Sequence, residues 1–267
     1  MDVFLPAVSR GLKVPHSVML WLFIIGFVAS VFGSMVGLGG GFIMVPVLRL
    51  MYGLSPPLAA GTSLALVVAS SLGGSIENLL QRRVHVRTGW LLAGGGIPGG
   101  ILGALAVKHS SETLFDWLFA LFLIAVSIDI VLNRQKRLTE GRDAEHNKPA
   151  VTLAMGFAVG FVSSLFGVGG GVILIPSLLY FTALPAHAIT ATSQFAILLT
   201  SPVGFIAHAV QRDVAWSYAA PLAAGGLLGG PVGARLSARV KSRPLMLCVA
   251  AALTIAAIAM VFRHITG

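Results

Sequence analysis

Two five-residue motifs rich in glycine are the segments of this chain best suited to bind an anion. They are Gly37–Gly41 (GLGGG) and Gly167–Gly171 (GVGGG). Glycine gains little from helical order and tolerates positive φ, so each motif should break a helix. A helix that starts after such a break presents unpaired N–H groups and the positive end of its dipole, which suit an oxyanion. The alternative is a tight turn that serves packing alone, and we favour binding because the motif occurs twice.

A Thr-Ser pair follows each motif and could donate hydroxyl hydrogen bonds to the same anion. The second pair is followed by Gln194, which adds an amide. Serine and threonine in apolar helices often bond only to their own backbone, which is the alternative here. The predicted substrate-binding residues are Gly37, Gly39, Gly40, Gly41, Thr62, Ser63, Gly167, Gly169, Gly170, Gly171, Thr192, Ser193 and Gln194.

Four polar residues near the ends of long apolar runs are candidates for coupling or gating. They form two equivalent pairs, Asn78 with His208 and Gln81 with Gln211. A histidine in an apolar run could bind a proton or the substrate. We favour the plainer interpretation of His208, a histidine satisfied near a helix end.

Charged residues within or beside the apolar runs have structural interpretations. Glu77 is a functional candidate because acids are costly inside a membrane, but an ion pair with the arginines at 82–83, one turn away, is at least as well supported. Asp116 and Asp129 flank an apolar run and are expected at the membrane interface. Arg49 could neutralise an anion or extend to the surface.

The composition shows what kind of chain must position these groups. Of the 267 residues, 56% are hydrophobic and 10% are charged, and the mean hydropathy is +0.91. A soluble globular domain carries about 25% charged residues. The chain is therefore expected to be an all-α polytopic membrane protein, which excludes a cytosolic enzyme and a disulfide-linked secreted domain. Its single cysteine, Cys248, cannot form an internal bridge.

Apolar runs divide the chain into expected membrane segments. Two runs, 42–52 and 172–183, follow the glycine motifs and are too short to cross a bilayer, which needs about 20 residues. The polar stretch 134–149 is expected to be a cytoplasmic linker. Eight runs are long enough to cross: 17–36, 57–81, 88–107, 112–133, 150–166, 186–211, 214–234 and 244–263.

The two halves of the chain repeat each other at an offset of 130 residues without a gap. The offset aligns the glycine motifs, the Thr-Ser pairs and two sets of GxxxG spacings, Gly95–Gly103 and Gly225–Gly233, which we expect to permit close helix packing. Duplicated membrane proteins are mostly transporters with a site at the repeat interface. The predicted organisation is repeat one at 1–133, the linker at 134–149, and repeat two at 150–267.

Loop charge predicts that the two repeats have opposite orientations. The loop 82–87 is basic, whereas its counterpart 212–217 has one arginine and one aspartate. The loop 108–111 has one lysine, whereas its counterpart 235–243 has four basic residues. The positive-inside rule then requires inverted repeats, each with a glycine-broken, re-entrant or discontinuous helix followed by three transmembrane helices. A plain eight-crossing arrangement would leave 235–243 outside.

The paired GxGGGxxxxP segments, Gly37–Pro46 and Gly167–Pro176, each followed by a Thr-Ser pair, resemble the TauE/SafE family of sulfite and sulfonate exporters. The resemblance covers both halves and so nearly the whole chain. It implies a secondary transporter that exports small sulfur oxyanions or organosulfonates, in a bacterial-type plasma (inner) membrane.

Transport of another small anion, a membrane-embedded enzyme and a scaffold subunit are the alternatives. An enzyme would need paired catalytic groups at depth, and the sequence has no duplicated acid pair, HExxH motif or P-loop. We therefore expect no catalytic residue, metal or cofactor. The expected partners are a small anionic substrate and the lipid bilayer but no nucleic acid. A coupling ion, either a proton or sodium, and a homodimer are left open.

Overall fold

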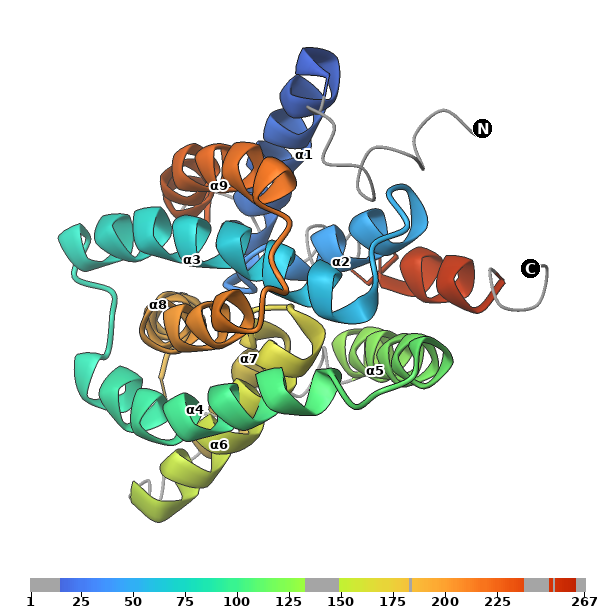
Figure 1. Cartoon of the computed structure of the whole chain (residues 1–267). Coiled ribbons are helices and arrows are strands. Elements are labelled where there is room, and N and C mark those ends of the chain that lie inside the picture. The colour runs from blue at the N-terminus through green and yellow to red at the C-terminus, as the bar shows by residue number, and fades with distance from the viewer. Residues whose placement is uncertain (1–14, 133–148, 183, 238–249, 252, 263–267) are drawn as a thin grey trace.

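A computed structural model of the chain describes residues 15–132, 149–182, 184–237, 250–251 and 253–262, and the regular elements in these ranges are α-helices (Figure 1). The first half contains α1 (His16–Val36), α2 (Gly41–Leu50), α3 (Pro56–Leu80), α4 (Val86–Val107) and α5 (Glu112–Leu132). The second contains α6 (Pro149–Phe166), α7 (Gly171–Phe181), α8 (Ala186–Val210), α9 (Trp216–Leu236) and a C-terminal helix, Leu253–Phe262.

The helix boundaries follow the sequence offset of 130 residues. Helices α3 and α8 match at both ends, and α2 and α7 begin at equivalent glycines. The predicted linker lies outside the described residues except for Pro149, which begins α6. Most of the predicted basic loop 235–243 also lies outside them.

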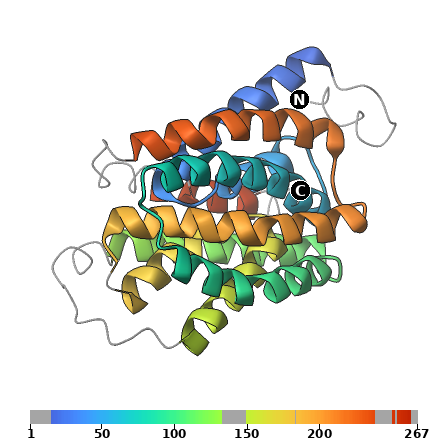
Figure 2. The ribbon, with the colours of Figure 1, turned by 90° about the vertical axis from the view of Figure 1, so that its left-hand side faces the viewer.

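Helices α3 and α8 lie side by side in the middle of the bundle (Figures 1 and 2). Helix α9 packs on α3 and carries α1 on its outer side, while α4 packs on α8 and carries α6. Each outer pair joins a helix of one half to a helix of the other. The short helices α2 and α7 lie toward one side of this stack, beside α5 (Figure 1).

Glycines make the closest helix contacts possible, as the GxxxG spacings predicted. A methyl group on Gly95 or Gly99 of α4 would collide with a carbonyl oxygen of α6, and one on Gly225 or Gly229 of α9 would collide with a carbonyl oxygen of α1. These helices therefore touch backbone to backbone, a packing mode that membrane bundles use because lipid provides no hydrophobic drive for helix association.

Within the described residues, five of the eight long runs form helices that are long and apolar enough, by length and composition, to cross a membrane. They correspond to α1, α3, α4, α6 and the part of α8 from His187. Large apolar side chains on the outside of these helices, such as Trp21, Trp90 and Ile206, are more than half exposed, which suits a lipid-facing surface.

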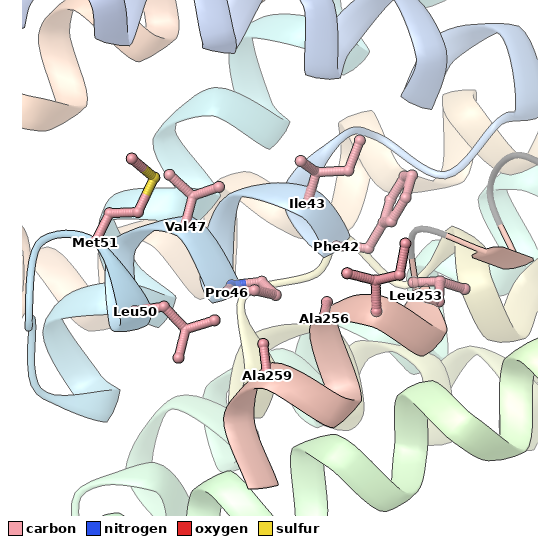
Figure 3. Close-up of a pocket in the computed structure, with 10 residues that line it drawn as sticks. Phe42, Ile43, Pro46, Val47, Leu50, Met51, Leu253, Ala256 and Ala259 are labelled. Carbon is pink, nitrogen blue, oxygen red and sulfur yellow. The ribbon is translucent and has the colours of Figure 1, made fainter. Parts of the chain in front are cut away.

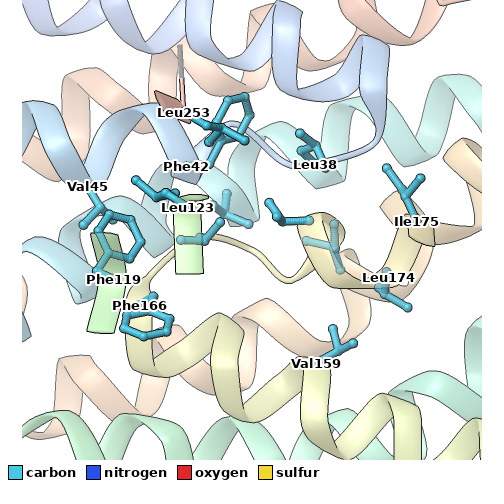
Figure 4. Packing of buried hydrophobic residues seen from close by; sticks show 14 of the residues in the cluster. Leu38, Phe42, Val45, Phe119, Leu123, Val159, Phe166, Leu174, Ile175 and Leu253 are labelled. Carbon is cyan, nitrogen blue, oxygen red and sulfur yellow. The ribbon is translucent and has the colours of Figure 1, made fainter. Parts of the chain in front are cut away.

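The main hydrophobic cluster surrounds the two glycine motifs (Figure 4). Leu38, within the first motif, belongs to the same cluster as Phe166, the last residue before the second motif. Phe119 of α5 packs against Phe166 with the ring centroids 5.2 Å apart. The cluster thus holds the two helix breaks together in the interior.

Two contacts show where the helices end relative to one another. Glu77, near the end of α3, pairs with Arg235, near the end of α9, at 2.9 Å. The Gln211 amide that follows α8 donates to the Ala104 carbonyl in the last turn of α4, at 3.2 Å. The end of the bundle with Glu77 and Arg235 also carries Arg82, which follows α3, and we call it the basic end. We call the other end, where Gln211 lies, the opposite end.

The Glu77–Arg235 pair also corrects one prediction. The expected helix-end ion pair exists, but its partner comes from the other half of the chain and not from the arginines at 82–83. The reason is the packing of α9 on α3, which brings their last turns together.

Candidate functional site

The two glycine motifs end one helix and begin the next, as predicted. Gly37 closes α1 in the left-handed conformation at φ 86°, and its N–H donates to the Gly33 carbonyl at 2.8 Å. Gly40 and Gly170 precede α2 and α7 with φ of 83° and 73°. A side chain at these positive φ values would be strained, so glycine is what permits each break.

The two breaks meet in the interior of the bundle. A methyl group on Gly41 would collide with the Gly167 carbonyl oxygen, and one on Gly171 would collide with the Gly37 carbonyl oxygen. Every residue of both motifs is buried. The Val67 side chain of α3 packs against both breaks, lying 3.3 Å from where a Gly39 Cβ would sit. The predicted binding segments are thus adjacent, and they are closed in this conformation.

The Thr-Ser pairs connect each half to the other. The Ser63 hydroxyl donates to the Gly167 carbonyl at 2.9 Å, and the equivalent Ser193 hydroxyl donates to the Gly37 carbonyl at 3.0 Å. The structure therefore brings these predicted residues to the glycine motifs, although their hydroxyl protons point to carbonyl oxygens here.

The threonines of these pairs accept hydrogen bonds from the loops that follow α3 and α8. The His85 N–H donates to the Thr192 hydroxyl at 2.9 Å, and the Ala215 N–H donates to the Thr62 hydroxyl at 3.0 Å. Each threonine side chain is fully buried. Acceptance of an N–H leaves the hydroxyl proton available to a further acceptor.

The N-terminal ends of α2 and α7 have the properties of an anion site. Neither end has a side-chain cap, and neither first turn contains an acidic residue. The first N–H groups of any helix have no acceptor within it. Their partial positive charge is therefore not neutralised by a neighbouring side chain at either break.

A chain of hydrogen bonds between neutral side chains lies beside the first break. Asn78 donates to the Gln194 amide oxygen at 3.3 Å, and the Gln194 amide donates to the Ser34 hydroxyl at 2.6 Å. Ser34 in turn contacts the Ser70 hydroxyl at 3.2 Å. We call these four residues the polar lane; all are at most 2% exposed.

Gln194 and Asn78 were predicted from the sequence, whereas Ser34 and Ser70 were not. The signal that could have found the two serines is the repeat, because the 130-residue offset places Ser164 and Thr200 at the equivalent positions. Hydroxyls at equivalent positions in two pairs of apolar helices are the kind of duplicated polar feature that singled out the Thr-Ser motifs.

His208 is fully buried beside the second break, with one of its ring nitrogens satisfied. Nε2 lies 2.9 Å from the Ser164 carbonyl oxygen in the last turn of α6. A carbonyl only accepts, so Nε2 carries the proton and Nδ1 has the lone pair. Within the described residues Nδ1 has no hydrogen-bond partner. The plainer interpretation, a histidine with satisfied hydrogen bonds, therefore holds for Nε2 but, among the described residues, not for Nδ1.

The two glutamines expected to couple or gate lie at opposite ends of the bundle. Gln81 donates to the Glu77 carboxylate at 2.7 Å at the basic end. Gln211 bonds to the Ala104 and Ala207 carbonyls at the opposite end. Neither contacts a glycine motif through a hydrogen bond in the part of the chain that the structure describes.

Arg49 does not extend to a surface, and it has an acidic partner. Its guanidinium binds both carboxylate oxygens of Asp116, at 2.9 and 2.5 Å, and the Leu54 carbonyl at 2.6 Å. Glu112 lies 3.4 Å away. Asp116, which the sequence predicted at the membrane interface, has a side chain that is only 2% exposed and that pairs with Arg49.

An apolar groove lies between α2 and the C-terminal helix (Figure 3). Its volume is about 370 Å³, and its lining, which includes Phe42, Pro46, Leu50 and Leu253, is apolar throughout. Such a groove offers no hydrogen-bond donor to an anion. The glycine breaks are therefore the better candidate site.

Comparison with known proteins gives one consistent result. The sequence profile of the family described as "Sulfite exporter TauE/SafE" matches residues 22–260. The probable membrane transporter proteins YunE and YjnA of Bacillus subtilis are each 28% identical to the chain; the alignments cover 85% and 88% of it, and 91% and 96% of those proteins. A probable membrane transporter protein of Haemophilus influenzae is 28% identical over 80% of the chain and 83% of its own length. No solved structure matches.

Proposed function

Since the chain belongs to the sulfite exporter TauE/SafE family of membrane transporters, we propose that it is a secondary transporter that exports small sulfur-containing anions such as sulfite and organosulfonates. The observation that carries this proposal is that two helix N-termini without side-chain caps lie in the buried interior, each packed against the break of the other half. Such ends stabilise an anion without a cationic side chain. The buried Arg49 is already neutralised by Asp116.

The proposed binding groups are the backbone N–H groups at the starts of α2 and α7 and the hydroxyls around them. Because the breaks touch in this conformation, an anion can enter only if they separate. Separation would release the Ser63 and Ser193 hydroxyls from their carbonyl acceptors. Those hydroxyls, and the protons of Thr62 and Thr192, then become donors to the anion.

We also propose that the two repeats are inverted in the membrane. Two contacts support this: the His85 N–H in the loop after α3 donates to Thr192 in the second turn of α8, and the Ala215 N–H in the loop after α8 donates to Thr62 in the second turn of α3, so each helix ends beside the start of the other. Equivalent helices that end at opposite ends of one bundle point in opposite directions. The basic end, with Arg82 and Arg235, would face the cytoplasm of a bacterial-type plasma membrane.

We propose that His208 binds a proton together with the anion. Among the residues that the structure describes, Nδ1 of His208 has no hydrogen-bond partner, and Nε2 binds the Ser164 carbonyl next to the second break. A proton there would add a positive charge close to the anion. The neighbouring charged group is Asp213, whose backbone N–H donates to the His208 carbonyl at 2.9 Å.

The experiment that tests the substrate class is a thermal-unfolding panel on the purified protein with sulfite, sulfate, thiosulfate, organosulfonates, carboxylates and simple cations. A ligand at 100 times its dissociation constant adds about 2.7 kcal/mol to stability. We expect sulfite or a sulfonate to raise the melting temperature and cations to leave it unchanged. A panel in which no anion stabilises the protein would reject the site.

Transport itself is measured with radiolabelled sulfite in inside-out vesicles. Accumulation in vesicles that contain the protein, above that in vesicles without it, is the expected result for an exporter. If the vesicles take up only a different anion, the protein is still a transporter, but sulfite is not its substrate.

A further inference from the structure

The polar lane continues the glycine breaks toward the basic end along one face of α3. Ser63, Val67, Ser70, Gly74 and Asn78 recur at helical spacing, so their side chains share that face. Ser63 contacts the second break, and Asn78 lies one turn from the end of α3. At 1.5 Å per residue the face extends about 22 Å, more than half of a hydrocarbon core about 30 Å thick.

Helices from both halves enclose this face. Ser34 comes from α1 and Gln194 from α8, and the Gln194 amide lies where a Gly74 side chain would be. A methyl group on Gly230 of α9 would collide with the Ser70 carbonyl oxygen. Helices α1, α3, α8 and α9 thus close the lane by direct packing, and glycines allow the fit.

Two further hydroxyls beside the lane have no hydrogen-bond partner within the described residues. They belong to Ser30, one turn before Ser34 on α1, and Ser75 of α3, and both side chains are fully buried. A buried polar group without a partner costs free energy, and at membrane depth that cost is highest. Unused polar groups beside the lane indicate a route that becomes wet or occupied in another conformation.

The chemistry of the lane suits a small oxyanion. Its four side chains are neutral and can all donate hydrogen bonds, so they can solvate an anion without a fixed charge that would hold it. Charged groups are found at its mouth, where Arg235 pairs with Glu77 and Arg82 is exposed. The basic residues at the end of the lane attract an anion, and the neutral donors inside the lane let it move on without holding it by a fixed charge.

The equivalent face of α8, which runs toward the opposite end, is closed differently. The Ser164 side chain lies nearest to where a Gly204 Cβ would sit, and Leu64, which takes the place of Gln194, has its Cδ1 3.5 Å from that position. That face therefore has an apolar side chain where the polar lane has an amide with exchangeable hydrogen bonds. Water or an anion can replace the bonds of the Gln194 amide, but it cannot replace the contacts of Leu64.

We propose that the polar lane is the passage by which the anion moves between the glycine breaks and the basic end, and that Gln194 closes it. Ser34 and Ser70 are then residues that contact the anion in transit. The identity of the cargo rests on the proposed function; the position of the passage rests on the contacts above.

The passage is tested by thiol labelling of Ser70→Cys and Asn78→Cys in a Cys248→Ser background. The reagents are a methanethiosulfonate with an ethylsulfonate group and its trimethylammonium counterpart, applied to vesicles of either orientation. We expect labelling from the basic end alone, with the sulfonate reagent at least threefold faster than the cation. Gln194→Leu, which installs the residue of the other repeat, should slow labelling at least fivefold, and Gln194→Ala should accelerate it.

Ser127→Cys is the matched control. Ser127 is also buried, at 7% exposure, but its hydroxyl bonds to Thr254 and the Ala250 carbonyl of the C-terminal segment. We expect it to remain unlabelled. Labelling of Ser70→Cys no faster than this control, labelling from the opposite end, or equal rates for both reagents would overturn the passage.

The labelling result and the transport result separate the two proposals. Side-specific labelling together with no uptake of any sulfur anion would keep the passage and reject the cargo. Sulfite transport by a protein whose lane cysteines never react would keep the cargo and reject the passage.

Discussion

Arg49 and Asp116 form a two-point ion pair in the interior of the bundle, with their side chains 1% and 2% exposed. The pair joins the last turn of α2 to the beginning of α5, at the end of α2 away from its glycine break. The repeat equivalents of the two residues are Leu179 and Met246. One half of the chain therefore uses a charged pair where the other has two apolar residues.

The first prediction uses that difference between the repeats. Arg49→Leu or Asp116→Met alone breaks the buried ion pair, and each should destabilise the protein by about 3–5 kcal/mol. The double variant removes both charges and installs the pair of the second half, so its stability should return to within about 1 kcal/mol of the wild type.

The melting temperatures of the wild type, the two single variants and the double variant are compared by thermal unfolding in the same detergent. Two single variants with wild-type melting temperatures would contradict the burial of the pair. A double variant as unstable as the single ones would show that the guanidinium is needed for its bond to the Leu54 carbonyl.

The second prediction concerns orientation in the membrane. Arg82 and Arg212 are repeat equivalents, both exposed and both at positive φ, in the loops after α3 and α8. Inverted repeats place them on opposite sides. We expect an impermeant thiol reagent to label Arg212→Cys in intact cells and Arg82→Cys only after the membrane is opened, each in a Cys248→Ser background. Labelling of both from one side would rule out the inversion.

The third prediction concerns the first glycine break. Gly39 has φ of 84°, and a Cβ there would lie 3.3 Å from Val67 and 3.8 Å from Ile197, so alanine strains the backbone more than it disturbs packing. The left-handed conformation costs an alanine about 1–2 kcal/mol. Gly39→Ala should therefore weaken sulfite binding at least tenfold, because the shifted N–H groups no longer converge on the anion.

Gly100→Ala is the control for that variant, since it adds the same methyl group inside α4 at 3.3 Å from Ser164. Binding is read from the sulfite concentration that raises the melting temperature of each variant. An unchanged sulfite affinity in Gly39→Ala would remove this glycine from the site.

The fourth prediction is a pH dependence that arises from His208. A proton on Nδ1 places a positive charge near the second break, so a bound proton and a bound anion stabilise each other. We expect the anion affinity of the wild type to rise as the pH falls through the range of about 8 to 5 in which histidines gain charge. His208→Asn installs the residue of the first repeat, Asn78, and should flatten this profile.

The control is His109→Asn, an exposed histidine in the loop after α4 whose ring bonds only to the Leu105 carbonyl. Its pH profile should match the wild type. A wild-type affinity that does not change with pH, or an unaltered profile in His208→Asn, would reject the proton site.

Local sequence determined where the helices begin and end. Each glycine motif interrupts a helix because its residues adopt positive φ, and this preference belongs to the residues themselves. The apolar runs predicted the helices to within a few residues, and the offset of 130 predicted equivalent boundaries in α3 and α8. Hydrophobic length and glycine content act over one segment at a time, so a single sequence is enough to read them.

The partners of the polar groups were decided by the tertiary structure. Ser63 bonds to a residue 104 positions away, Ser193 to one 156 away, and Gln194 to one 160 away. Arg49 finds Asp116 across 67 positions. A buried donor takes whichever acceptor the packing of two helices brings within about 3 Å, and that packing is set by glycine contacts summed over whole helices. The sequence therefore determined which groups needed a partner, and only the folded bundle determined which partner each received.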